Sequence, residues 1–211
     1  MNVLSLESSG PAGSVAVLVD GRLCEAWSFS CPRGRGGELF PALEAAVARV
    51  GRADLVVVGT GPGGYNGLRM SVAAAWGVAT AHGARLVGVP SLLGYGEPEY
   101  FVAGDARGGQ WFLARVSQGR LVHAPVLIAP GEASALLDPG VPVFCPGGLA
   151  GLPDARCVPP SAQILALRTD SFGAPAPFYL KPPHITKPAK PSASVKHVPA
   201  VGKCLAAEYG R

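Results

Sequence analysis

A glycine-rich segment is the part of the chain best suited to binding chemistry. Residues 59–69 read GTGPGGYNGLR and join a β-branched apolar run at residues 55–58 to an alanine-rich stretch at residues 70–82. The first flank predicts a buried strand and the second a helix. Glycines permit close backbone approach, and the unpaired N–H groups of a first helical turn attract anions. The candidate phosphate or nucleotide contacts are Gly61, Gly63, Gly64, Gly67 and Arg69.

The same turn also has a purely structural interpretation. It lacks the Lys-Ser/Thr ending of a P-loop. A tight glycine turn also lets a helix and a sheet pack closely. Arg69 could pair with an anion, pair with an acid on a partner, or be solvated. The sequence leaves these alternatives open.

Two carboxylates lie where strands are expected to end. Glu7 closes a strand predicted near the start of the chain, and Asp105 follows the apolar run at residues 100–104. At such positions a sugar kinase or ATPase holds a metal-bound water or places a base. The alternative for Asp105 is to cap its turn or to pair with Arg107.

Cysteines and histidines are scattered along the chain. None of the five cysteines forms a Cys-x-x-Cys pair, which predicts free thiols in a reducing compartment. The four histidines lack metal-ligand spacing. We therefore predict no metal site, and no nucleophile–base pair supports a peptidase.

The elements around these residues predict the order βββαβαβ. Strands are expected at residues 3–6, 14–19 and 22–29, with a hairpin turn at Asp20-Gly21. A helix at residues 41–50 that ends at Gly51, a strand at 55–59, a helix at 70–82 and a strand at 85–89 follow. An antiparallel meander with two crossover units predicts a mixed sheet with helices on one face. Such a sheet resembles the first lobe of the actin-like ATPase superfold, which includes sugar kinases.

A shorter second unit follows. It comprises a strand at residues 100–104, a hairpin of 110–116 with 120–128, a helix at 131–137, a strand at 141–145 and a helix at 161–168 with Ser161 as N-cap. We therefore predict a first lobe at residues 1–97, a reduced second lobe at 98–180 and a basic, Pro-rich tail at 181–211. Its prolines forbid a long helix, so the tail is expected to be extended and flexible.

Composition limits the class of protein. The chain has 211 residues, of which 48% are hydrophobic and 15% charged, which predicts a globular protein. Its apolar runs are too short to span a bilayer and its start lacks the features of a signal peptide, so we expect a cytoplasmic protein without membrane contact. Residues 181–211 hold six Lys or Arg residues and one acid, Glu208. That tail could bind a polyanion such as tRNA or be a solvated terminus.

Several segments resemble the bacterial TsaB (YeaZ) family. The opening VLSLESS and SVAV segments look like its first strands, and residues 59–69 resemble its Gly-x-Gly-Pro-Gly-Ser-Phe-Thr-Gly-Leu-Arg signature. Residues 87–92 look like its next strand. Residues 105–112 are similar to its Asp-Ala-Arg-Arg-Gly-Glu-Val-Tyr segment, and residues 177–183 to its closing Pro-x-Tyr-Leu-Arg segment. The resemblance covers residues 1–183 and is strongest in the first lobe.

The chain also departs from the family pattern. The differences lie at Glu7, where Asp is usual, at Arg35-Gly36-Gly37, where the family has His-Ser, and at Gly64-Tyr65-Asn66. They concern residues that could contact a nucleotide, and not the elements of the fold.

The resemblance implies a two-lobed actin-like ATPase (ribonuclease H-like) fold and a non-catalytic scaffold for N6-threonylcarbamoyladenosine (t6A37) modification of tRNA. Such a scaffold pairs with a TsaD-like transferase, which holds the metal, and works with a TsaE-like ATPase. The resemblance further implies that tRNA is reached through this complex and that the isolated chain self-associates. No firmly bound cofactor is expected, although ATP or ADP could bind at the partner interface.

In this family the two helices of the first lobe make the pairing surface. Small residues allow close helix approach, Met adapts to irregular surfaces, and an exposed Trp is a good anchor. The predicted interface residues are Phe40, Leu43, Val47, Met70, Ala73, Ala74, Trp76 and Gly77. Ordinary sheet-facing core is the alternative for one helix face.

Two enzymatic functions remain as alternatives to the scaffold. A small-molecule kinase or ATPase of the same superfold would turn over nucleotide alone and lose that activity on Asp105→Asn. A glycoprotease-like peptidase is the other, and the sequence offers no catalytic residues for it.

Overall fold

The first lobe is built on a five-stranded sheet in the order β3-β2-β1-β4-β5. Its strands are β1 (Asn2–Glu7), β2 (Ala12–Val19), β3 (Arg22–Ser30), β4 (Leu55–Gly59) and β5 (Arg85–Val89). The first three pair antiparallel, and β4 and β5 continue parallel to β1, which confirms the predicted mixed sheet. The structure is a computed structural model that describes residues 1–31 and 38–181. The predictions for Gly36-Gly37 and for the tail beyond residue 181 therefore lie outside the described residues.

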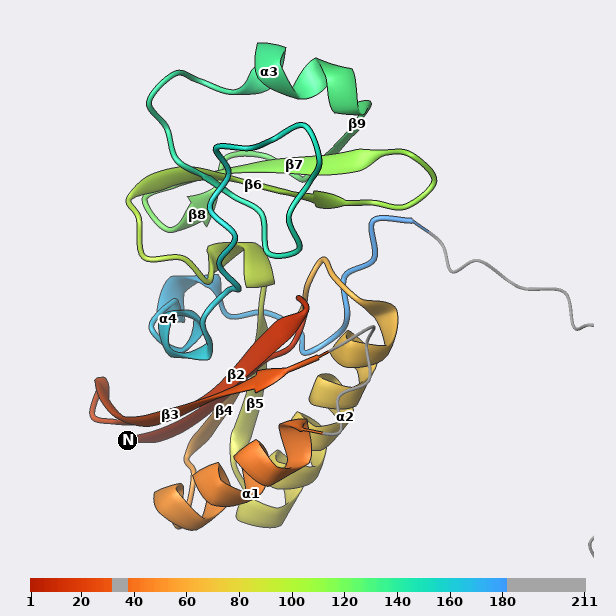
Figure 1. Cartoon of the computed structure of the whole chain (residues 1–211). Coiled ribbons are helices and arrows are strands. Elements are labelled where there is room, and N and C mark those ends of the chain that lie inside the picture. Colours follow the sequence, from red (N-terminus) through yellow and green to blue (C-terminus); the bar gives the residue numbers. More distant parts are fainter. Residues whose placement is uncertain (32–37, 182–211) are drawn as a thin grey trace, which may run out of the picture.

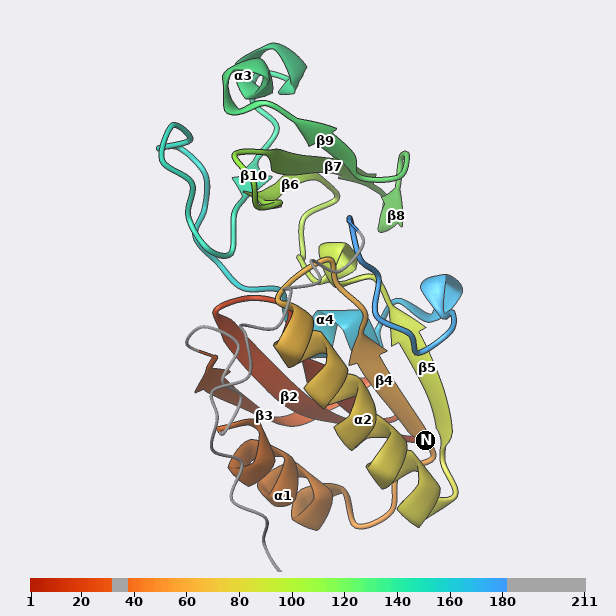
Figure 2. The same cartoon turned by 90° about the vertical axis from the view of Figure 1, so that its right-hand side faces the viewer.

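Helices cover both faces of this sheet. The helices α1 (Leu39–Val50) and α2 (Tyr65–His82) pack on one face, as predicted, and α4 (Ala162–Ala166) packs on the other (Figures 1 and 2). Alternate residues of a strand point to opposite faces, so Val56 faces α1 and α2 whereas Val57 faces α4. Burial on both faces explains why β4 is a continuous apolar run.

The end of α1 at Gly51 agrees with the prediction, whereas the capping of α4 by Ser161 does not. The N–H of Gly51 closes α1 on the carbonyl oxygen of Val47, at 3.2 Å. Ser161 occupies the N-cap position of α4, but its side chain makes no capping bond. The hydroxyl of Ser14, in β2, accepts the N–H of Ala162 at 3.0 Å instead. The cap of α4 is therefore supplied by the sheet that the helix covers.

The second lobe is a smaller sheet in the order β10-β6-β7-β8, with β9 also paired to β7. Its elements are β6 (Glu99–Asp105), β7 (Trp111–Ser117), β8 (Arg120–Leu121), β9 (Val126–Ile128), α3 (Ala133–Leu136) and β10 (Val143–Phe144). Short 3-10 helices lie at Ser91–Leu93, Pro130–Glu132 and Thr169–Ser171. The single strand predicted at residues 120–128 is two strands, because Pro125 offers no N–H and the chain leaves the ladder between them.

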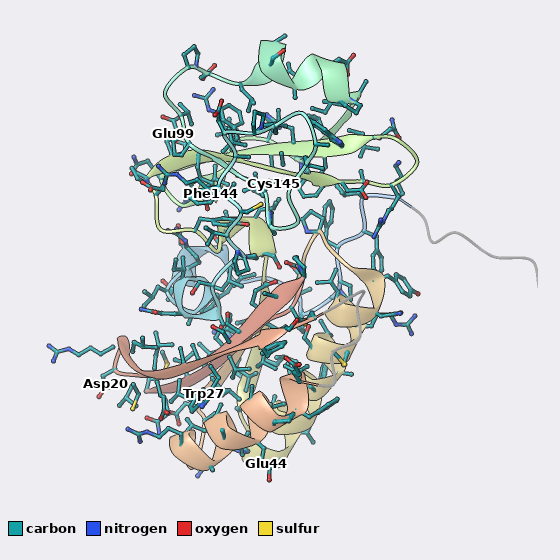
Figure 3. The ribbon with its side chains drawn as sticks, in the orientation of Figure 1. Asp20, Trp27, Glu44, Glu99, Phe144 and Cys145 are labelled. Atoms are coloured by element: carbon teal, nitrogen blue, oxygen red, sulfur yellow. The ribbon has the colours of Figure 1, made fainter. Side chains whose placement is uncertain are left out.

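One core cluster joins the two lobes. It contains Val57 of the first sheet, Leu165 of α4, Tyr100 and Phe144 of the second sheet, and Tyr95. Tyr95 stacks on Phe144 with ring centroids 4.3 Å apart, and Figure 3 shows Phe144 in the second lobe. The contacts of α4 show that the chain returns to the first lobe after residue 160, while the lobe boundary at residue 97 stays a prediction.

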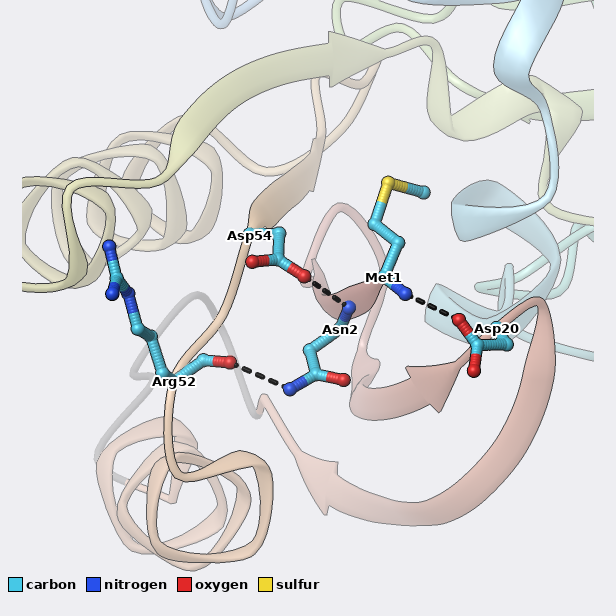
Figure 4. A network of polar contacts seen from close by, with 5 residues as sticks. All are labelled: Met1, Asn2, Asp20, Arg52 and Asp54. Carbon is cyan, nitrogen blue, oxygen red and sulfur yellow. Dashed lines mark hydrogen bonds and ion pairs between the residues drawn. The ribbon is translucent and has the colours of Figure 1, made fainter.

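The amino end of β1 is held by a polar network (Figure 4). The backbone N–H of Asn2 donates to Asp54 Oδ2 at 2.7 Å, and its side-chain amide donates to the carbonyl of Arg52 at 3.0 Å. The amino group of Met1 pairs with Asp20. These bonds fix the register of β1 between β2 and β4, at the end of the sheet opposite the glycine-rich turn.

None of the helices in residues 1–31 and 38–181 is both long and apolar enough to cross a bilayer.

Candidate functional site

The glycine-rich segment connects the carboxyl end of β4 to α2, as predicted, but α2 begins at Tyr65 and not at residue 70, so the turn itself is residues 60–64. A Cβ at Gly63 would lie 2.2 Å from the carbonyl oxygen of Ser9, and one at Gly67 would lie 2.7 Å from that of Ser8. The N–H of Gly64, just before α2, donates to the same Ser9 oxygen at 2.9 Å. These glycines are therefore required for close packing against the β1–β2 turn, which supports the structural interpretation of the motif.

A chain of hydrogen bonds ties this turn to the ends of the neighbouring strands. Gly61 has a φ of +95° and donates its N–H to the Ser91 hydroxyl at 2.9 Å. Ser91 in turn donates to Glu7 Oε2 at 2.6 Å, and Glu7 Oε1 accepts the N–H of Ser9 at 2.5 Å. The carboxyl ends of β1, β4 and β5 are thus joined through one carboxyl group.

That carboxyl group is sealed inside the protein. Glu7 is fully buried, and a Cβ at Gly59 would lie 1.7 Å from its Oε2 atom. Loss of water raises the pKa of Glu7 above its ordinary range, while its hydrogen bonds to Ser9 and Ser91 oppose that shift. Its neighbours make Glu7 an internal tie between strands. Among residues 1–31 and 38–181, no three His, Cys, Asp or Glu side chains gather where they could hold a metal ion.

The pH dependence of stability tests this environment. Above the ordinary carboxyl pKa of 4.5 and below the raised native pKa, the native Glu7 holds a proton that the unfolded chain has lost. Stability therefore falls as pH rises through that window, with a slope approaching about 1.4 kcal/mol per pH unit. We expect Glu7→Gln to remove this slope in denaturant unfolding measured over a pH series. The control Glu44→Gln, at a side chain that points away from α1 into solvent (Figure 3), should keep it.

Asp105 has a local role, as the turn-capping alternative predicted. Its carboxylate accepts the N–H of Arg107 at 2.7 Å and pairs with the Arg107 guanidinium at 3.0 Å. Asp105 shares no hydrogen bond with Glu7, since each carboxylate is engaged in its own network. The structure therefore does not join the two carboxylates into one polar network.

The segment at residues 173–181, here called the C-terminal strap, was not foreseen. It runs from the first lobe to the second and is the blue chain in Figure 1. Gly173 exchanges two hydrogen bonds with Gly88 at the edge of β5, at 2.8 and 2.9 Å. The N–H of Phe178 donates to the carbonyl of Thr60 at 2.8 Å, directly beside the glycine-rich turn. The strap therefore lies against the candidate phosphate site.

The strap ends on the second lobe. The Lys181 amino group donates to the carbonyl oxygen of Arg107 at 2.9 Å. On the way, the Tyr179 ring stacks on Tyr65 of α2, with centroids 5.0 Å apart. The sequence signal for this strap is Gly88, where a Cβ would lie 2.3 Å from the carbonyl oxygen of Ala174. The sequence around Gly88 does not indicate which distant segment packs against it, so the strap could not be predicted from this glycine alone.

The predicted interface residues are divided between surface and core. Phe40, Ala73, Trp76 and Gly77 are exposed, Val47, Met70 and Ala74 are half-buried against the core, and Leu43 is buried. The interface predicted on α1 comprised Phe40, Leu43 and Val47, and the structure places these three side chains in different environments. The core face consists of Leu39, Ala42, Leu43, Ala46 and Val50, so Phe40 faces solvent. Leu43 is thus a core residue.

The outer surface of α2 is unusual. We define the α2 face as the exposed residues of this helix beyond residue 70, which are Ala73, Trp76, Gly77, Thr80 and Ala81. From residue 70 to residue 81 the helix has no charged residue, and Trp76 is 54% exposed. Most exposed helix surfaces are charged or polar, so this face lacks the usual solvent-facing side chains.

The chain has the actin-like ATPase fold, which is defined by three features. It has two lobes, a mixed sheet in which β1, β2 and β3 pair antiparallel while β4 and β5 run parallel to β1, and a glycine-rich turn at the strand ends. YeaZ from Pseudomonas aeruginosa has the same fold, with a TM-score of 0.65 and 22% identity over 85% of this chain and 99% of that one. The family model TsaD, described as tRNA N6-adenosine threonylcarbamoyltransferase, matches residues 39–133. These matches confirm the resemblance found in the sequence.

Two mycobacterial proteins are related along most of the chain. The uncharacterized protein Rv3421c of Mycobacterium tuberculosis is 33% identical over 164 residues, which cover 74% of this chain and 75% of that protein. The uncharacterized protein ML0378 of Mycobacterium leprae is 30% identical over 182 residues, and the chain spans about half, 48%, of its length. The chain belongs to the same family as these mycobacterial proteins.

Proposed function

We propose that this chain is a non-catalytic docking subunit for N6-threonylcarbamoyladenosine modification of tRNA. The observation that carries the proposal is the α2 face, with its exposed Trp76, its small residues and its lack of charge. Exposed aromatic anchors on uncharged surfaces are typical of protein interfaces. Small neighbours such as Ala73 and Gly77 allow another helix to approach closely.

The partner we propose is a TsaD-like transferase. The TsaD family match spans residues 39–133, which include both α1 and α2, so a partner of that family would present related helices. Packing of related helices on each other would bury the α2 face, and the same packing between two copies would let the isolated chain self-associate. A TsaE-like ATPase would act on the pair, in the cytoplasm, and ATP or ADP would bind near Arg69 at the edge of this interface.

The non-catalytic role is supported by the hydrogen bonding of the two carboxylates at the strand ends. Glu7 is enclosed and bonded to Ser91, and Asp105 is engaged by Arg107. The C-terminal strap lies against the glycine-rich turn, where a kinase would admit its nucleotide. Docking would act by binding the active conformation of the transferase better than its other conformations, which shifts the partner's population.

The proposal is tested by complex formation with the TsaD-like subunit of the same organism. Gly77→Arg adds a long charged side chain at a position with open space, and Trp76→Ala removes the anchor. We expect each to weaken the complex by about 30-fold or more in calorimetric titration, as for an interface hot spot. These sites are preferable to Ala74, which packs against the core.

The matched control is Leu136→Arg, at an exposed leucine on α3 in the second lobe. It should leave affinity for the transferase unchanged. Equal affinity of the wild type, Gly77→Arg and Trp76→Ala would contradict the docking role. Nucleotide turnover by the isolated chain, lost on Asp105→Asn, would favour the kinase or ATPase alternative.

A further inference from the structure

The C-terminal strap assembles a surface from three distant parts of the chain. We call it the aromatic–cationic patch and define it as Tyr65, Arg69, Arg107, Tyr179 and Lys181. Tyr65 and Arg69 come from the first turns of α2, Arg107 from the β6–β7 turn, and the other two from the strap. The patch therefore exists only in the folded chain.

The aromatic half of the patch is a stacked pair. The rings of Tyr65 and Tyr179 have centroids 5.0 Å apart and an interplanar angle of 29°. They remain 41% and 37% exposed, respectively, which is high for aromatic residues already packed on each other. The Arg69 guanidinium lies 5.2 Å from the Tyr65 centroid and donates to the Tyr65 hydroxyl at 2.5 Å. The result is an exposed aromatic pair in which a cation lies over the Tyr65 ring and the Tyr179 ring is at the outer end.

The cationic half continues from the strap to the second lobe. Lys181 follows Tyr179 by two residues and is held on the carbonyl of Arg107 at 2.9 Å. The Arg107 side chain is 90% exposed. The acid bonded to the patch is Asp105, which pairs with Arg107. Three cations against one acid leave a net positive surface.

We propose that the aromatic–cationic patch binds single-stranded RNA. Exposed aromatic rings offer stacking surfaces to bases, and nearby Lys and Arg side chains bind the phosphates between them. The charge continues beyond the described chain, because residues 182–211 hold five Lys or Arg residues and one acid. This charge favours a polyanion over an ordinary protein partner.

The length of the patch favours a strand over a free nucleotide. Its contacts lead from Arg69 through the tyrosine pair and the strap to Arg107, and so from the first lobe to the second. A single nucleotide would contact one end of the patch, whereas a single-stranded RNA can contact both ends. The choice of RNA over DNA rests on the proposed function. The patch adjoins the α2 face, so RNA bound here would lie beside a docked transferase.

The test is direct binding of a fluorescein-labelled single-stranded RNA to the full chain, measured by anisotropy at several salt concentrations. Tyr179→Ala should weaken binding roughly fivefold to a hundredfold, which is the range for the loss of one stacking side chain. Arg107→Gln should reduce the slope of log affinity against log salt by about 0.7, as for one lost phosphate contact on a single strand. Tyr179→Phe keeps the ring and should bind as the wild type does.

The matched charge control is Arg22→Gln, at an exposed arginine beside the β2–β3 turn at the opposite end of the first sheet. It should change neither affinity nor slope. Because Arg107 is almost fully exposed, its variant should fold even if Tyr179→Ala does not. The proposal is overturned if the wild type binds no RNA at low salt, if ADP binds but RNA does not, or if Arg107→Gln and Arg22→Gln have equal effects. Because no transferase is present in this assay, its outcome is independent of the docking test.

Discussion

Replacement of Gly59 by alanine is expected to lower the free energy of unfolding by about 3 kcal/mol, at the upper end of the cost of overpacking a core. The new methyl group would lie 1.7 Å from Glu7 Oε2, inside a fully buried site. Neither group can move into solvent, so strands β1 and β4 must separate. Denaturant unfolding measures the loss. The control Gly131→Ala, where nothing lies within 4 Å of the added carbon, should change stability by less than about 0.5 kcal/mol.

A second substitution identifies the cause of that loss. Glu7→Asp shortens the carboxyl side chain by one methylene, so it should relieve the clash in the Gly59→Ala background. We expect the double variant to lose about 1–2 kcal/mol less free energy of unfolding than the two single variants lose together, which is a typical coupling for residues in contact. Strict additivity would show that the cost arises elsewhere.

The substitution of Gly by Ala is expected to have opposite signs at Gly77 and Gly88. At Gly77, in the middle of α2, the added carbon meets open space, so the higher helix propensity of Ala should stabilise the chain by about 1 kcal/mol. At Gly88 it would lie 2.3 Å from the carbonyl oxygen of Ala174, so the C-terminal strap must leave β5. That displacement breaks two hydrogen bonds and should cost about 2–3 kcal/mol.

The two variants form a matched pair, because the chemical change is identical. Thermal and denaturant unfolding should rank them as Gly77→Ala above the wild type and Gly88→Ala below it. Proteolysis should also cut Gly88→Ala within residues 173–181 more readily, since the displaced strap is accessible. If both variants were destabilised equally, the strap contact would not be the cause.

Local patterns in the sequence were sufficient for most of the fold. The hairpin turn at Asp20-Gly21 was predictable because this residue pair favours the positive φ values that such a turn requires. In the structure these values are +50° and +76°. Strand β4 was predictable from its apolar run, and the glycine-rich turn from its position between β4 and α2. Asp105 and Arg107 are two residues apart, so their ion pair also followed from the local sequence.

Contacts between distant segments were not predictable in this way. The helix α4 has the pattern of any short amphipathic helix, and nothing local indicates that it covers β1 and β2 of the first lobe. Its cap comes from Ser14, far away in the sequence. Phe40 and Leu39 are adjacent apolar residues at the start of α1, and only the packing of the helix on the sheet decides which one is buried. The candidate site shares this limit, since the strap and its patch depend on such contacts.

The position of α4 has a consequence for synthesis of the protein. The strands β1 and β2 are translated before α4, which covers the face that carries Val3, Ala16 and Leu18 and is complete only at residue 166. A ribosome-bound chain must therefore hold an uncovered apolar sheet face until α4 has been made. Such late, long-range closure slows folding and exposes nascent chains to aggregation. Chaperone engagement should accordingly persist until residues 162–166 have emerged.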